Sequence, residues 1–108
     1  MTWIVETWGN AVDAEIEALP IDIRAKLERF RIDIERNGPM SLPKPYAKFL
    51  GDGLWELRLS GRDGIARVIY ITVAVRRVIF LRAFVKKTQK TPPSELKLAR
   101  TRARMLMI

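Results

Sequence analysis

Hydrophobic positions in the first part of the chain change from strand spacing to helix spacing. Residues 2–8 are rich in β-branched and aromatic side chains and are followed by Gly9, which predicts a short strand. Apolar side chains then recur at helical spacing over residues 11–19, where Asn10 is placed to cap a helix and Pro20 to end it. The chain is therefore expected to begin with a strand and a short helix.

The second predicted helix covers residues 22–37 and carries the clearest periodic pattern. Its apolar stripe consists of Ile23, Leu27, Phe30 and Ile34. Oppositely charged side chains lie one turn apart outside this stripe, which supports the helix. Gly38 and Pro39 then end it, because glycine accepts the left-handed cap conformation and proline cannot continue a helix.

The pattern changes after this helix. Residues 38–53 hold three prolines and three glycines, which predicts a long connection with little regular structure. Three β-rich runs follow at residues 54–60, 65–75 and 77–85, and the short breaks between them are typical of an antiparallel meander. A basic C-terminal helix is expected to come last, with Thr91 or Ser94 as its cap.

This order of elements predicts one α+β domain over residues 1–108. The length is the usual size of a single domain that buries its own core. The helices, including the N-terminal helical hairpin, are expected to pack on one face of a small antiparallel sheet.

Charge is distributed unevenly along the chain. The net charge is +8, with no histidine to make it depend on pH near neutrality. Residues 1–75 hold ten lysines and arginines against eleven acids, a net of −1, whereas residues 76–108 hold ten against one, a net of +9. Such a basic block indicates contact with a phosphate backbone. A solubilising surface and a contact for an acidic protein are the alternatives.

The sequence has neither cysteine nor histidine. This composition excludes disulfides, thiolate nucleophiles, histidine-based catalysis and the common zinc sites, so no metal or cofactor is expected. The N-terminus soon becomes acidic and no apolar run is long enough to span a membrane, so a cytoplasmic location is expected.

Cationic side chains interrupt the predicted strands. They are Arg58, Arg67, Arg82 and, at the end of the last strand, Lys86 and Lys87. On adjacent strands they would form a surface suited to binding phosphate and stabilising charge on its oxygens. The alternative is a solvated sheet face on which Arg58 or Arg67 pairs with Glu56. Glu56 is the only acid inside these runs, so catalysis by paired carboxylates is not favoured.

Three motifs follow one another in the predicted sheet. They read Leu54-Trp55-Glu56-Leu57-Arg58, Ala66-Arg67-Val68-Ile69-Tyr70 and Phe80-Leu81-Arg82-Ala83-Phe84-Val85-Lys86-Lys87-Thr88-Gln89-Lys90-Thr91-Pro92. In this order and spacing they resemble the phage-related HigB-like toxins of the RelE/ParE superfamily, and the likeness extends over nearly the whole chain. The resemblance implies a RelE-like fold and membership of a type II toxin–antitoxin system.

The resemblance further implies a metal-independent, ribosome-dependent mRNA endonuclease, in which the 2′-hydroxyl of the substrate attacks the adjacent phosphate. Arg67 matches the arginine that holds the scissile phosphate, Arg58 a basic residue that assists the 2′-hydroxyl or the transition state, and Lys87 the basic residue near the leaving oxygen. The residues implied to bind RNA are Arg82, Phe84 as a stacking surface, Lys86 as a second phosphate contact, and Lys90. A cognate antitoxin, usually of the helix-turn-helix type, would cover this site.

This sequence departs from relatives that use a terminal tyrosine or active-site histidines for proton transfer. Tyr70 is expected to belong to the core rather than to the site. Arg67 is expected to be exposed, so that its replacement by alanine would leave the fold intact. Two alternatives remain, a ParE-like gyrase inhibitor of the same fold and a non-catalytic basic RNA-binding module.

Overall fold

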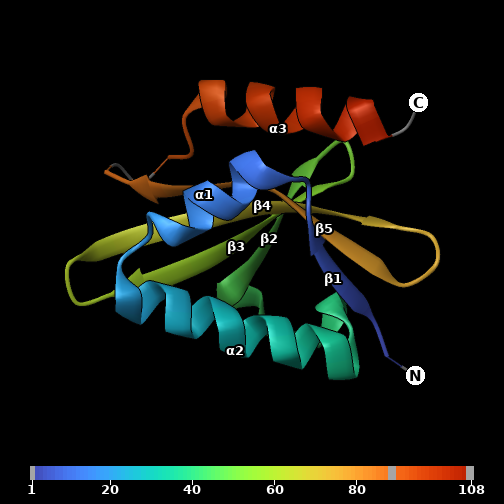
Figure 1. Ribbon diagram of the computed structural model, residues 1–108, viewed down its shortest axis with the longest axis horizontal. Coiled ribbons are helices and arrows are strands. Elements are labelled where there is room, and N and C mark those ends of the chain that lie inside the picture. The colour runs from blue at the N-terminus through green and yellow to red at the C-terminus, as the bar shows by residue number, and fades with distance from the viewer. Residues whose placement is uncertain (1, 88–89, 107–108) are drawn as a thin grey trace.

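The protein is an α+β domain in which a five-stranded sheet lies between helices (Figure 1). The computed structural model describes residues 2–87 and 90–106. The elements follow in the order β1 (Ile4–Thr7), α1 (Asn10–Glu17), α2 (Ile21–Asn37), the 3-10 turns η1 (Pro39–Ser41) and η2 (Lys44–Tyr46), β2 (Ala47–Gly51), β3 (Leu54–Gly61), β4 (Gly64–Val73), β5 (Arg77–Lys86) and α3 (Pro93–Leu106). The predicted α+β fold class, with its N-terminal strand, two helices and C-terminal helix, is confirmed.

The sheet is mixed rather than wholly antiparallel. Its strand order is β1-β5-β4-β3-β2, and β2 to β5 form an antiparallel meander. β1 lies parallel to β5, with Ile4 opposite Arg77 and Thr7 opposite Phe80. Parallel pairing is possible here because helices and three strands separate β1 from β5 along the chain, whereas a short hairpin would force the antiparallel direction.

The two faces of the sheet carry separate apolar cores. On one face, Tyr70 and Phe80 are buried in a cluster completed by residues of α1 and α2. On the other, Leu81 packs in a second cluster with Ala99 and Ala103 of α3. Figure 1 shows α2 and α3 on opposite sides of the sheet, so the expectation that all helices share one face is wrong. The central strands are apolar on both faces, and each face therefore needs a cover.

The segment expected to be irregular contains an additional strand. Two 3-10 turns lead into β2, which pairs with β3 at the edge of the sheet. Gly51, Asp52 and Gly53 all have positive φ angles, of 93°, 54° and 79°, and form the tight turn between the two strands. The glycines are typical of a loop, but here they supply the left-handed backbone that a hairpin turn requires.

Helix caps differ from the sequence prediction in two places. Gly9 occupies the N-cap of α1 without a side-chain cap, and Asn10 is the first helical residue. Ser94 lies inside α3, and the Thr91 hydroxyl donates to a carboxylate on β3. Gly38 ends α2 as predicted, with a φ of 84° and its N–H donating to the Ile34 carbonyl. None of the helices in the described part of the chain has both the length and the apolar character needed to cross a bilayer.

Candidate phosphate-binding site

The central feature of the candidate site is a carboxylate between two arginines. Arg58 on β3 and Arg67 on β4 lie directly opposite each other in the antiparallel register, a placement in which like charges repel. Oε1 of Glu56 lies 3.4 Å from Nε of Arg58 and 3.4 Å from Nε of Arg67. The carboxylate therefore compensates the repulsion between the two guanidinium groups.

Glu56 also connects the sheet to the beginning of α3. It is 1% exposed, and its second oxygen accepts a hydrogen bond from the Thr91 hydroxyl. The alternative in which Arg58 or Arg67 pairs with Glu56 is thus present for both arginines, whereas the contact with Thr91 was not predicted. The available signal for the pair with Arg58 was the position of Glu56 two residues before it, since residues at i and i+2 of a strand share one face.

Two lysines complete the cationic cluster, which comprises Lys48, Arg58, Arg67 and Lys86 around Glu56. Lys86 is 5% exposed at the end of β5, and Lys48 on β2 is the register partner of Glu56. Burial, together with the positive charges of Arg67, Arg58 and Lys48, lowers the pKa of the Lys86 ammonium, while Glu56 acts in the opposite direction. Lys48 was missed because its segment was expected to be a loop.

Arg67 is buried, contrary to the sequence prediction. It is 7% exposed, and its Nη1 donates to the Ala66 carbonyl at 3.0 Å. Burial lowers the pKa of its guanidinium, opposed by the charge of Glu56 and assisted by that of Arg58. The expected exposure of Arg67 is therefore wrong, and an alanine at this position would leave a buried acid without one of its partners.

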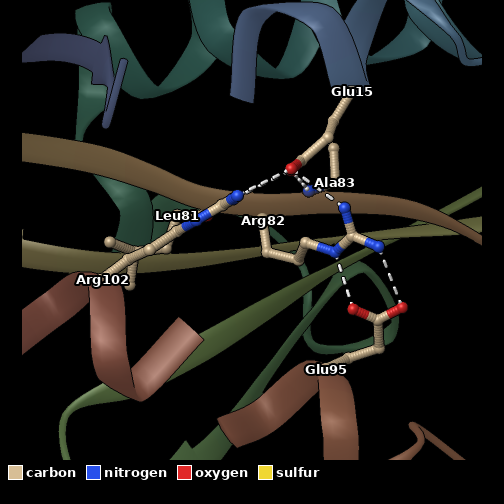
Figure 2. Close-up of polar contacts among 6 residues, drawn as sticks. All are labelled: Glu15, Leu81, Arg82, Ala83, Glu95 and Arg102. Atoms are coloured by element: carbon tan, nitrogen blue, oxygen red, sulfur yellow. Dashed lines mark hydrogen bonds and ion pairs between the residues drawn. The ribbon is translucent and has the colours of Figure 1, made fainter. Parts of the chain in front are cut away.

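Arg82 lies in a different network, which joins three elements (Figure 2). Its Nε and Nη2 donate to the two Glu95 oxygens at 2.6 and 3.1 Å, and its Nη1 lies 2.9 Å from Oε2 of Glu15. Arg102 donates to the same Glu15 carboxylate and to the Leu81 carbonyl. The predicted RNA ligand Arg82 is thus held between a carboxylate of α1 and one of α3, where it connects both helices to β5.

The other predicted site residues, Phe84, Lys87 and Lys90, differ in exposure. Phe84 is 7% exposed in the second core, so it does not offer the open stacking surface that was predicted. Lys87 follows the end of β5 with an exposed side chain, and Lys90 is also exposed. Tyr70 is a core residue, as predicted, and burial raises its pKa to about 12, which makes it a poor proton acceptor near neutral pH.

Four arginines of the basic C-terminal block form ion pairs with acids. In these pairs, Arg77 contacts Glu6, Arg82 contacts Glu15 and Glu95, Arg100 contacts Asp52, and Arg102 contacts Glu15. The cluster on β2 to β5 combines cations from both halves of the sequence.

This arrangement is suited to an anionic ligand. Guanidinium and ammonium groups that are held in fixed positions, in surroundings of low dielectric constant, stabilise negative charge more strongly than the same groups do in water. No group of three or more acidic, histidine or cysteine side chains within residues 2–87 and 90–106 is arranged to hold a metal ion. The chemistry available to the cluster is phosphate binding and charge stabilisation.

Comparison with known proteins identifies the family. The model of the family described as phage derived protein Gp49-like (DUF891) matches residues 14–104. The chain belongs to this family. The match covers α2, the meander and most of α3, and so includes every residue of the cationic cluster. No curated protein sequence matches this Gp49-like chain significantly.

Solved structures show the same fold for this Gp49-like protein. A variant of the Escherichia coli toxin RelE in which two arginines are replaced by alanine, in the free state, matches with a TM-score of 0.63 and 10% identity, over 100% of both chains. The archaeal RelE–RelB complex from Pyrococcus horikoshii matches with a TM-score of 0.56 and 20% identity, over 79% of this chain and 96% of that one. The Gp49-like chain therefore has a RelE-like fold.

Proposed function

We propose that this protein is the toxin of a type II toxin–antitoxin system and that it cleaves mRNA on the ribosome in the cytoplasm. The observation that carries the proposal is the cationic cluster around Glu56, which lies on the central strands of a RelE-like fold. The family match and the two RelE structures support the toxin assignment.

In the proposed reaction, the 2′-hydroxyl oxygen of one nucleotide attacks the adjacent phosphorus. The bond from phosphorus to the 5′-oxygen of the next nucleotide breaks, leaving a cyclic phosphate, while solvent takes the 2′-hydroxyl proton and supplies the proton of the free 5′-hydroxyl. Arg58, about one third exposed, binds the phosphate directly. Arg67 and Lys86 lie beneath it and stabilise the extra negative charge of the transition state. Lys87 neutralises charge near the leaving oxygen.

Glu56 is assigned a positioning role in this reaction. Its oxygens already contact Thr91 and both arginines, and it is almost fully buried. A carboxylate in that position keeps two repelling guanidinium groups next to each other, so that both act on a single phosphate. Catalysis then depends on placement and charge rather than on a histidine or tyrosine.

A cognate antitoxin is the second part of the proposal. One of the similar structures is a RelE–RelB complex, and this supports an antitoxin partner for the present chain. An antitoxin of the helix-turn-helix type would carry acidic side chains to the cationic cluster and block access of RNA.

The test is induction of the protein in growing bacteria, with new 5′ ends mapped on cellular mRNA. Breaks within translated codons are expected for the wild type and for Lys97→Gln, a charge-matched control on the exposed side of α3. They are expected to disappear with Arg58→Gln. Growth arrest without breaks, accompanied by loss of DNA supercoiling, would favour a gyrase inhibitor, and no arrest would favour a non-catalytic RNA-binding module.

A further inference from the structure

A groove lies beside the cationic cluster, at the outer edge of β3. β2 pairs with β3 only as far as Leu57, so that, among the described residues, the end of β3 has no strand on that side. α2 runs past this edge, and Lys26 donates to the Ser60 carbonyl. The groove has a volume of about 330 Å³ and is lined by Lys26, Arg29, Phe30, Asp33, Tyr46, Arg58, Leu59 and Ser60.

The lining of the groove combines positive charge with an accessible aromatic ring. Three cations face one acid, which gives a local excess of positive charge. Tyr46 is 45% exposed, and its ring packs against that of Phe30, with the ring centroids 5.2 Å apart. Arg29 is exposed and forms no ion pair with any residue of the described ranges. The groove therefore offers charge for phosphates and a flat surface for a base.

Arg58 connects the groove to the cationic cluster. Arg58 lines the groove and its guanidinium contacts Glu56 on the sheet, so a chain of phosphates bound at the cluster can continue past Arg58 towards α2. A basic track with exposed aromatic side chains is the usual arrangement for single-stranded nucleic acid, because each base has a face that can stack. An acidic peptide would use the cations but would gain little from the ring.

We propose that this groove binds the single-stranded RNA that flanks the scissile phosphate, with one base stacked on Tyr46 and a phosphate at Arg29. The proposal rests on the proposed function for its substrate class. The subsite is separate from the reacting atoms, so its binding can be measured without cleavage.

The test is fluorescence anisotropy with a labelled 2′-O-methyl oligonucleotide of mixed sequence, which lacks the attacking hydroxyl. Tyr46→Ala is expected to weaken binding about tenfold, while Tyr46→Phe, which keeps the ring, stays near the wild type. Arg29→Gln is expected to weaken binding and to lower the slope of log Kd against log salt by about one. Lys97→Gln removes the same charge on the far side of the molecule and is the matched control.

Several outcomes would overturn the subsite. These are unchanged binding by Tyr46→Ala with an intact circular dichroism spectrum, equal loss in Tyr46→Phe, or no binding of the oligonucleotide by the wild type. Displacement of the RNA by polyglutamate, with no dependence on Tyr46, would assign the groove to an acidic protein segment instead. Binding that depends on Tyr46 without mRNA cleavage in cells would retain the subsite and refute the nuclease. Cleavage of mRNA that is unaffected by Tyr46→Ala would retain the nuclease and refute the subsite.

Discussion

The substitution Glu56→Gln tests the bridge between the two arginines. Glutamine has nearly the same shape and keeps an oxygen for the Thr91 hydroxyl, so the main loss is the negative charge. At an effective dielectric constant of about 20, unit charges at the observed 3.4 Å separation attract by about 5 kcal/mol before desolvation is counted. The pair with Arg58 contributes less, because that side chain is about one third exposed and solvent screens it.

The expected net effect is a loss of about 3 kcal/mol in the free energy of unfolding, since removing one partner leaves buried cations uncompensated. In a domain of this size, that loss lowers Tm by about 12 °C or more. Urea unfolding at neutral pH, followed by circular dichroism, measures it. Asp52→Asn, which breaks the exposed pair with Arg100, is the matched control and should cost less than about 1 kcal/mol.

A double-mutant cycle with Arg67→Met separates the pair from general damage to the fold. Each single variant leaves one charge unpaired, whereas the double variant Glu56→Gln/Arg67→Met removes both. The double variant should therefore be more stable than the sum of the two single effects predicts, by about 1–3 kcal/mol. Effects that add within about 0.5 kcal/mol would refute the argument that Glu56 and Arg67 stabilise each other.

Three further predictions concern the rest of the fold. Burial raises the pKa of Glu15, but the hydrogen bond from Arg102 and the other contacts outweigh burial and bring the pKa below 4.5. The stability that this group contributes is therefore present above about pH 4.5 and is lost as the pH falls through the lowered pKa. Urea midpoints measured down to pH 3 should consequently fall less in Glu15→Gln than in the wild type. Gly38→Ala should lower the free energy of unfolding by more than about 1 kcal/mol, because φ is 84° and a Cβ would lie 2.8 Å from Trp3 Nε1; an unchanged Tm would contradict this. Arg82→Gln should cost about 2 kcal/mol of stability, because it breaks the link between α1 and α3, and should leave the Kd for the oligonucleotide unchanged; weaker binding at unchanged stability would instead make Arg82 an RNA ligand.

Local patterns determined most of the secondary structure. The apolar stripe of α2 and the β-rich runs of β3, β4 and β5 are signals contained within a few residues, and the elements form where those signals lie. The family motifs also lie in these strands, so the fold class and family could be predicted from the sequence. β2 was missed because its glycines and neighbouring prolines resemble a loop, and only its pairing with β3 makes it a strand.

The tertiary structure alone decided which charges are available for function. Arg58 and Arg67 could be assigned to strands from the sequence, but the burial of Arg67 and its contact with Glu56 depend on the pairing of β3 with β4 and on the cover supplied from the C-terminal side. Arg102 and Glu15 are 87 residues apart, and no local pattern indicates that they meet. The composition gives the number of charged residues, but which of them form ion pairs or are buried depends on contacts between distant segments of the chain. The sequence therefore predicted a basic protein, and the fold determined that Lys48, Arg58, Arg67 and Lys86 gather around Glu56.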